Sequence, residues 1–186
     1  CPSSLIITHV DLDEPQGDQR LLAHLRAMGA EFTVDAQRQT LKVSGPQSLR
    51  GICVDVNDCI DMVTILAVMG AFASGKTIIT GAAMARQKEC NRLAVMQDVL
   101  MRMGAVVTCT QDGLVIEGGH RLQAIRGHGH RDHRIVLAWS VAAMAVEGET
   151  VITDSHWVTK SFPGFVSGMQ ALGANMTIQP SVDVMA

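Results

Sequence analysis

The hydrophobic positions of the chain pick out helices of two kinds. Segments 61–73 and 133–146 are apolar on almost every side, so we expect two helices that are buried all round. Segments 19–28 and 91–103 each lead into a Gly-Ala pair, where the glycine can adopt the left-handed conformation that ends a helix. Short β-branched runs beside glycine turns predict strands between the helices. These runs are 4–8, 41–45, 77–80, 114–118 and 151–153.

The same elements recur along the chain at a nearly constant interval. The interval from Gly45 to Gly118 equals that from Gly75 to Gly148, and all four glycines lie beside predicted strands. Each unit combines strands, a helix with a Gly-Ala exit and a buried helix, and the chain holds about two and a half such units. Buried helices surrounded by sheets predict an α/β fold, called α+β in some schemes.

Composition excludes several classes of function. The chain has 186 residues, of which 47% are hydrophobic and 18% charged, as expected for a globular domain with a core. A net charge of −3 and an aromatic content of 3% argue against nucleic-acid and membrane partners. Five cysteines without a C-x-x-C pattern favour a reducing cytoplasm over a disulfide framework. Cys59 and Cys90 are expected as packing residues, because neither has a recognisable base partner.

Two motif matches are interpreted as accidental. Segment 70–77 fits the phosphate-binding loop pattern G-x-x-x-x-G-K-[ST]. That motif requires a strand before it and a helix after it, whereas here a buried helix precedes a strand. His128, His130 and His133 form H-x-H-x-x-H, but spacing alone does not supply the fixed geometry of a metal site. We therefore expect a glycine-rich loop there, and no metal.

Polar residues concentrate in four short clusters, each at the predicted start of a helix. The clusters are 58–61, 86–92, 127–134 and 159–163. Helix starts carry free N–H donors and partial positive charge, so Asp58 and Asp132 are expected as helix caps. Basic residues oppose the dipole at that position. An anionic ligand is the natural reason for placing them there.

The repeat predicts that several of these residues occupy equivalent positions. The interval from Asp61 to Gly75 equals the interval from Arg134 to Gly148. Arg92 and Lys160 each precede a Gly-Ala exit, and those two intervals differ by a single position. Equivalent positions of repeated units meet at one end of a domain, so we expect one charged cluster. Its members are Lys88, Arg92, Arg134 and Lys160, with Asp61 and Glu89 among them. The residues alone predict binding of, or transfer to, a multiply anionic small molecule.

Taken in order, the clusters resemble the 5-enolpyruvylshikimate 3-phosphate synthase family. Segment 86–92 is similar to the family's R-x-K-E-x-D-R, with Asn91 in place of the usual Asp. Segment 132–134 is similar to its D-H-R, and segment 160–163 to its K-[ST]-F-P. Asp61 stands where the family's Asp opens an apolar helix. The resemblance covers almost the whole chain.

The resemblance implies an enolpyruvate transferase fold, in which each of two domains contains three βαβαββ units. Residues 1–186 would then form an incomplete C-terminal domain with about two of the three units, and the N-terminal domain would be absent. The implied reaction is the transfer of the enolpyruvyl group of phosphoenolpyruvate to the 5-hydroxyl of shikimate 3-phosphate, with release of phosphate. This addition–elimination belongs to aromatic amino-acid biosynthesis and is the target of glyphosate. The chain alone would be inactive, because its partner is the missing N-terminal domain.

The resemblance also implies roles for individual residues. Asp61 and Glu89 would act as base and acid, in an order that stays open. Substrate binding would fall to the remaining members of the cluster, namely Lys88, Arg92, Arg134, Lys160 and His133. No cofactor or metal is implied.

Two alternatives remain at this stage. One is a relative of the UDP-N-acetylglucosamine enolpyruvyl transferases, which share the repeat fold but lack D-H-R and K-[ST]-F-P. The other is a non-catalytic fragment or interaction domain that keeps the fold without its partner half.

Overall fold

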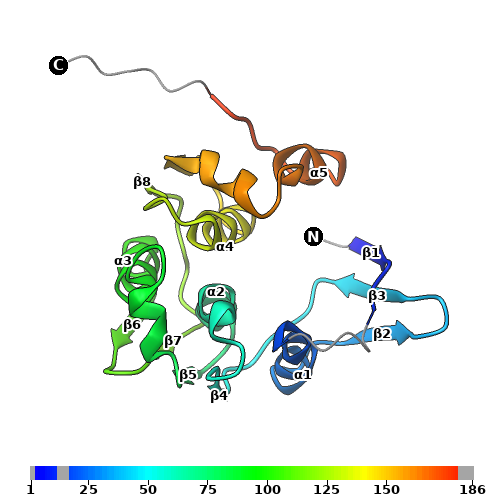
Figure 1. The fold of residues 1–186 in the computed structure, drawn as a ribbon, viewed down its shortest axis with the longest axis horizontal. Coiled ribbons are helices and arrows are strands. Elements are labelled where there is room, and N and C mark those ends of the chain that lie inside the picture. The colour runs from blue at the N-terminus through cyan, green and yellow to red at the C-terminus, as the bar shows by residue number, and fades with distance from the viewer. Residues whose placement is uncertain (1–2, 12–16, 180–186) are drawn as a thin grey trace.

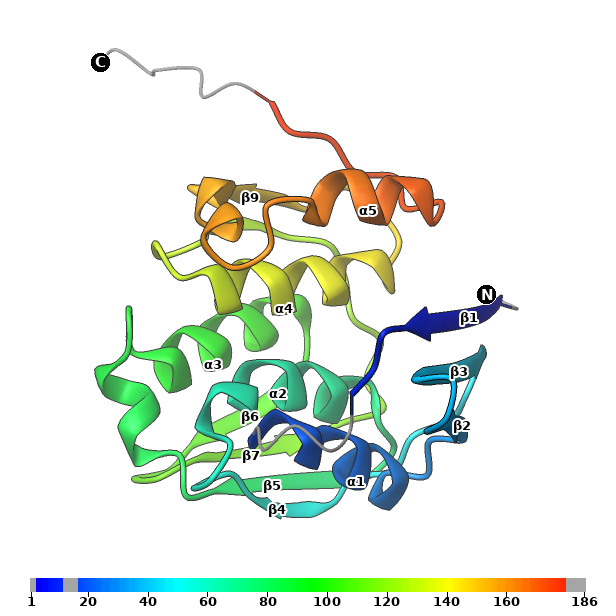
Figure 2. The same ribbon diagram turned by 45° about the vertical axis from the view of Figure 1, so that its right-hand side comes forward.

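A computed structural model describes residues 3–11 and 17–179 and shows stacked layers of sheet and helix (Figures 1 and 2). The first unit contains a three-stranded antiparallel sheet in the order β1-β3-β2, with one helix beside it. Its elements are β1 (Ser3–Thr8), η1 (Gly17–Gln19), α1 (Arg20–Ala27), β2 (Phe32–Asp35) and β3 (Thr40–Gly45). No residue of α1 is fully buried, so this unit forms the loosely packed edge of the molecule.

The second unit is complete and carries the main sheet. Its four strands have the order β4-β5-β7-β6, in which only β4 and β5 are parallel. The strands are β4 (Cys53–Asp55), β5 (Lys76–Thr80), β6 (Val106–Cys109) and β7 (Leu114–Glu117). The helices are η2 (Ile60–Met62), α2 (Val63–Phe72), η3 (Ala83–Gln87) and α3 (Arg92–Met103).

The third unit lies on the far side of α3 from the main sheet, as Figure 2 shows. Its two strands, β8 (Arg126–His128) and β9 (Val151–Thr153), form a parallel pair. Its helices are α4 (His133–Met144), η4 (Ser155–Lys160) and α5 (Phe165–Ala171).

The register of the sheets confirms the repeat predicted from the sequence. In the second unit Cys53 pairs with Ile78, and in the third unit Arg126 pairs with Val151. The interval from Cys53 to Arg126 equals that from Ile78 to Val151, and the paired glycines of the repeat show the same interval. The α/β fold class is confirmed as well, with α2 and α4 as equivalent helices. The expectation that segment 133–146 is buried all round is wrong, because Val141 and Met144 of α4 are exposed.

Local sequence explains where the central helices begin and end. Asn91 caps α3 by accepting a hydrogen bond from the Ala94 amide at 3.2 Å. Gly104 ends the same helix at φ 109°, a left-handed conformation that glycine adopts without steric cost. Asp132 caps α4 by accepting from the Arg134 amide at 2.9 Å. The predicted starts of these two helices are therefore confirmed.

The core lies where α2, α3 and α4 meet one another and where α2 and α3 pack on the face of the main sheet. Trp139 of α4 is fully buried there, in the same core cluster as Leu66 of α2 and Met96 of α3. A smaller cluster of Val136, Val158 and Phe165 holds η4 and α5 against α4. This packing brings the starts of α2, α3 and α4 together at one end of the core.

The structure corrects two expectations about helix starts. Lys160 does not begin a helix but ends η4, and α5 begins later, at Phe165. Pro163 explains the gap, because the residue before a proline is disfavoured in helical conformation. Asp58 does not cap a helix; it is an exposed residue whose carboxylate lies 2.8 Å from the Arg20 guanidinium.

Candidate active site

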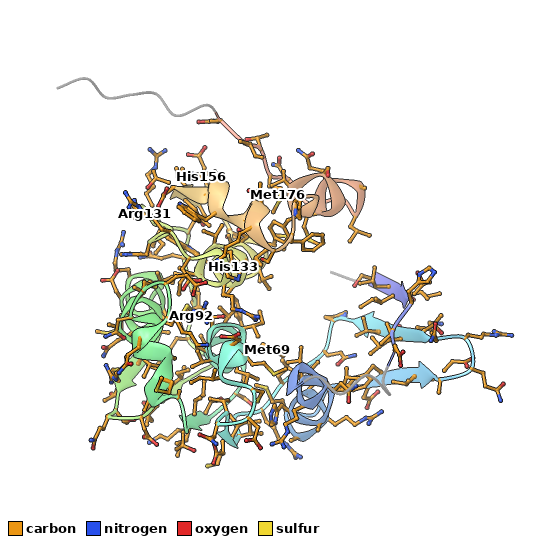
Figure 3. All side chains as sticks on the ribbon, viewed as in Figure 1. Met69, Arg92, Arg131, His133, His156 and Met176 are labelled. Atoms are coloured by element: carbon orange, nitrogen blue, oxygen red, sulfur yellow. The ribbon has the colours of Figure 1, made fainter. Side chains whose placement is uncertain are left out.

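The predicted charged cluster assembles at the end of the core where the helices begin. Its members come from four segments of the chain and contact one another directly or through a shared partner. They are Asp61 in η2, Lys88 and Glu89 between η3 and α3, Arg92 at the start of α3, His133 and Arg134 at the start of α4, and Lys160 at the end of η4. Figure 3 shows Arg92 and His133 in this region, where α2, α3 and α4 approach one another.

Arg92 is the hub of the cluster. Its side chain is only 2% exposed, and its guanidinium contacts three carboxylates. Nε donates to Asp132 Oδ2 at 2.8 Å, Nη1 to Asp61 Oδ1 at 2.7 Å, and Nη2 to Glu89 Oε2 at 2.7 Å. Such charge-assisted contacts are the strong class of protein hydrogen bonds. Burial acts to lower the pKa of Arg92, but the three carboxylates outweigh burial and raise it.

Asp61 lies between several cations at the open side of the hub. Its Oδ1 is 3.4 Å from Lys88 Nζ, and its Oδ2 is 3.3 Å from Arg134 Nη2. Burial of the Asp61 carboxyl acts to raise its pKa, but the charge of Arg134 and the hydrogen bond and charge of Arg92 outweigh burial. The pKa therefore lies below its ordinary value, and Asp61 is ionised at neutral pH.

Glu89 connects the second unit to the third. Lys160 Nζ donates to Glu89 Oε1 at 2.9 Å, across 71 positions of sequence. This hydrogen bond, with help from a backbone donor, lowers the pKa of Glu89 from 4.5 to about 2. His133 Nδ1 lies 3.7 Å from the same oxygen, too far for a hydrogen bond, and is a buried ring nitrogen without a partner of its own. Burial lowers the pKa of His133, which favours its neutral form.

Asp132 and Arg86 contribute to the site in ways that the sequence did not reveal. Asp132 was expected only as a helix cap, yet its carboxylate is 0% exposed and pairs with Arg92. Arg86 lies in the predicted cluster 86–92 but points toward the β6–β7 turn. There it donates to the Gln111 carbonyl at 3.1 Å and to Cys109 Sγ at 3.1 Å. Arg86 therefore anchors η3, which leads into Lys88 and Glu89.

The balance of charge suits an anionic ligand. With Asp132 counted, four cations meet three carboxylates, so one positive charge is in excess, and the first turn of α4 adds its dipole. The three cations other than Arg92 are accessible: the side chain of Lys88 is 35% exposed, that of Arg134 32% and that of Lys160 51%.

A cavity of about 200 Å³ opens beside the cluster. Asp61 and Arg134 form its polar end. Its other walls are mainly apolar and come from α1, η2, α2 and α4. A small ligand at this polar end would face Asp61 and Arg134 together.

The two motif matches do not form sites of their own. Segment 70–77 runs from the end of α2 into β5, the opposite order to a phosphate-binding loop, and Lys76 Nζ lies 3.3 Å from Glu117 Oε1. His128 and His130 contact each other edge to face at 5.3 Å between ring centroids, whereas His133 faces Glu89. Within residues 3–11 and 17–179, no group of three or more His, Cys, Asp and Glu side chains is arranged to hold a metal ion.

The cysteines that flank the cluster are packing residues. Burial and the charge of Asp132 raise the pKa of the Cys90 thiol to about 12, which suppresses the nucleophilic thiolate. Cys59 is buried in the core. The expectation that it has no base partner is wrong, because its Sγ lies 3.8 Å from His24 Nε2. Separately, none of the helices in the described part of the chain has the length and apolar character needed to cross a membrane.

Comparison with known proteins agrees with this arrangement. The family model for EPSP synthase (3-phosphoshikimate 1-carboxyvinyltransferase) matches residues 1–169. A 3-phosphoshikimate 1-carboxyvinyltransferase of Methanococcus maripaludis strain C5 is 39% identical over 176 residues, which cover 95% of this chain and 41% of the relative. One from Methanocaldococcus jannaschii is 38% identical over 177 residues, with the same coverage of both chains.

A solved structure gives the same result. The EPSP synthase of Acinetobacter baumannii superposes with a TM-score of 0.82 at 30% identity, covering 96% of this chain and 43% of that protein. The chain thus spans about two fifths of the length of the relatives it matches. On sequence and on structure, it belongs to the EPSP synthase (3-phosphoshikimate 1-carboxyvinyltransferase) family.

Proposed function

We propose that the protein containing this chain transfers the enolpyruvyl group of phosphoenolpyruvate to the 5-hydroxyl of shikimate 3-phosphate and releases phosphate. The observation that carries the proposal is the convergence of Lys88, Arg134 and Lys160 on two ionised carboxylates. Both substrates carry several negative charges, so their site needs cations that remain accessible to a ligand. The reaction also moves protons at two positions, and carboxylates beside those cations can accept and donate them.

Arg134 and Lys160 are proposed to hold the phosphate and carboxylate of phosphoenolpyruvate. The planar guanidinium of Arg134 can contact either group through two parallel N–H bonds, whereas the Lys160 ammonium acts as a point charge. Lys88 would reach shikimate 3-phosphate. In a closed site, these fixed charges would stabilise the negative charge that develops during addition.

Asp61 and Glu89 are proposed as the proton-transferring groups. Both are ionised in the ligand-free arrangement, so either can accept the proton of the 5-hydroxyl. The group that protonates the methylene carbon must itself carry a proton, so its pKa must rise before this step. Since the hydrogen bond from Lys160 is the main cause of the low pKa of Glu89, a substrate anion that drew Lys160 away would raise this pKa.

His133 is proposed to orient Glu89 rather than to carry charge. Its Nδ1 lies 3.7 Å from Glu89 Oε1, and burial lowers its pKa. A neutral ring can complete a hydrogen bond to Glu89 after a small shift when the site closes on substrate.

The rest of the site is proposed to come from the remainder of the protein. Residues 1–186 would form part of one domain, with about two of its three repeat units, and the other domain would face the charged cluster across a cleft. The chain alone would then bind the substrates weakly and show no turnover. The cytoplasmic location expected from the cysteine content remains a prediction.

Phosphate release from phosphoenolpyruvate and shikimate 3-phosphate tests the proposal in the intact protein. We expect turnover in the wild type and a severe loss in Arg134→Gln. Arg121→Gln is the matched control, because that side chain is 92% exposed and its partner Glu147 is exposed as well. Absence of turnover in a folded wild type would refute the proposed reaction. Turnover with UDP-N-acetylglucosamine instead would identify the related cell-wall enzyme.

A further inference from the structure

Asp132 makes more contacts than a helix cap requires. Oδ1 accepts from the Arg134 amide at 2.9 Å, which is the capping hydrogen bond. The same carboxylate accepts from Arg92 Nε at 2.8 Å and from Arg92 Nη2 at 3.2 Å, so it grips the guanidinium through two N–H groups. Cys90 Sγ donates to Oδ2 at 3.5 Å. One buried carboxylate thus joins the first turns of α3 and α4.

The burial of this pair is the unusual feature. A cap residue normally remains in contact with water, whereas the side chains of Asp132 and Arg92 are 0% and 2% exposed. Removing two charges from water is costly unless their geometry is good and their remaining polar atoms have partners. Here both oxygens of Asp132 and all three nitrogens of Arg92 are bonded. The guanidinium is therefore held in one plane.

We propose that Asp132 is a positioning residue for the transfer reaction, an inference that rests on the proposed function. It acts through Arg92 and touches no reacting atom. Asp132 accepts hydrogen bonds from Nε and Nη2 of Arg92 and so fixes the orientation of the guanidinium. In this orientation Nη1 and Nη2 donate to Asp61 and Glu89, the two proposed proton-transferring groups. Through its cap it also fixes the backbone at Arg134, the proposed phosphate ligand.

The proposal differs from a purely structural role in what loss of Asp132 would do. Without the Asp132 carboxylate, the Arg92 guanidinium would still be attracted by Asp61 and Glu89, but its plane would no longer be fixed. Asp61 and Glu89 would then lose their fixed separation, and Arg134 would lose its fixed backbone. The larger effect should fall on the phosphoenolpyruvate side of the site, because Arg134 and Lys160 lie next to those two carboxylates and Arg134 also loses its cap. Among the contacts of the described residues, the shikimate 3-phosphate side is linked to them only through the pair of Lys88 with Asp61.

The test compares two substitutions of Asp132 in the intact protein. Asp132→Asn is nearly isosteric and retains an oxygen that can cap α4, but it lacks the charge that pairs with Arg92. Asp132→Ser is smaller, retains a capping oxygen, and provides the measurement if the Asn variant does not fold. Asp98→Asn is the control, because it removes an exposed ion pair with Arg102 from the middle of α3.

We expect both variants of Asp132 to raise the KM for phosphoenolpyruvate by about tenfold or more and to lower kcat, as loss of a charged hydrogen bond predicts. The KM for shikimate 3-phosphate should change by less than about threefold, and Asp98→Asn should match the wild type within about twofold. A folded Asp132 variant with an unchanged KM for phosphoenolpyruvate would overturn the inference, and so would equal losses for both substrates. An inactive wild type would instead refute the proposed function, and the inference with it.

Discussion

The charged cluster has a buried side and an open side, built from similar ion pairs. On the buried side, Arg92 and Asp132 are 2% and 0% exposed and are 2.8 Å apart. On the open side, Lys160 Nζ lies 2.9 Å from Glu89, but the lysine side chain is 51% exposed. The distances are nearly equal and the environments are opposite. A charge that is shielded from water cannot easily change partners, whereas an exposed one can exchange a carboxylate for a ligand.

The two sides of the cluster therefore have different roles, one in stability and one in ligand binding. The buried pair joins α3 to α4 and resists rearrangement, because an unpaired charge there would be costly. The open pairs contribute little to folding, because water and salt screen them. We therefore expect substitutions on the buried side to lower the free energy of unfolding, and those on the open side to weaken ligand binding.

The largest effect is expected for Arg92→Met. This change leaves Asp61, Glu89 and Asp132 without their shared cation, so the free energy of unfolding should fall by about 3–5 kcal/mol. Urea denaturation followed by circular dichroism measures it. Arg121→Met is the control, because its exposed pair with Glu147 should contribute less than about 1 kcal/mol. Similar values for the two variants would remove the distinction between the two sides of the cluster.

A large effect on binding, with little effect on stability, is expected for Arg134→Gln. The affinity for an unreactive analogue of phosphoenolpyruvate, measured in the presence of shikimate 3-phosphate, should fall by about 10- to 100-fold, as loss of a charged hydrogen bond predicts. The free energy of unfolding should change by less than about 1 kcal/mol, because the Asp61 pair is partly exposed. Calorimetric titration and urea denaturation of the same preparation measure the two quantities. If Arg134→Gln lowered the free energy of unfolding more than Arg92→Met, the result would contradict the distinction between the buried side and the open side of the cluster.

A smaller effect, visible mainly in acid, is expected for Lys160→Met. The pKa of Glu89 should rise from about 2 toward its ordinary value of 4.5, because the hydrogen bond from Lys160 is the main cause of the shift. Because the folded pKa is the lower one, the ionised Glu89 stabilises the fold above pH 4.5, and this contribution is lost as the pH falls toward 2. Stability measured between pH 2 and pH 6 should therefore depend less on pH in the variant. An identical profile in both proteins would show that Lys160 does not hold Glu89.

The smallest effect is expected in the alkylation of Cys90, whose thiol donates to Asp132 on the buried side of the cluster. The pKa of Cys90 is raised to about 12, whereas Cys53 is exposed on β4. Iodoacetamide at pH 8 should therefore modify Cys53 well before Cys90, since the thiolate is the reactive form. Peptide mass spectrometry over time measures both rates. Rapid labelling of Cys90 would mean that the region around Asp132 opens readily.

The fold was largely predictable because each element predicted in one repeat unit is predicted again at the equivalent position of the next. The apolar segments 61–73 and 133–146 contain α2 and α4, and the Gly-Ala exit after segment 91–103 ends α3. The apolar character of a helix and the conformation of a glycine can be predicted from local sequence. A second copy of the same pattern confirms each assignment.

The location of Lys160 shows the limit of that reasoning. Counting back from Gly104 reaches the first residue of α3, but counting back from Gly173 passes through the shorter α5 and reaches the end of η4. If the parallel strands are aligned instead, Lys160 corresponds to Gln87 at the end of η3, next to Lys88. The prediction that Lys160 joins the cluster was confirmed, although the structural reason given for it was wrong.

The pairing within the cluster was not predictable. Spacing along the chain indicated that Arg92 and Glu89 would be near Asp61, but the contact between Arg92 and Asp132 spans 40 positions and depends on how α3 packs against α4. A carboxylate before a helix has the same sequence signature whether it faces water or a buried guanidinium. Only the packed structure distinguishes a simple cap from the buried partner of the central arginine.

A crystal structure of the intact protein with shikimate 3-phosphate and an unreactive analogue of phosphoenolpyruvate tests the division of the cluster most directly. We predict that the anionic groups of the analogue bind the Arg134 guanidinium and the Lys160 ammonium, with Lys160 displaced from Glu89. The ion pair of Arg92 with Asp132 should remain as it is in the ligand-free protein. Anions bound away from Arg134 and Lys160, or an Arg92 that leaves Asp132 to hold them, would contradict the account.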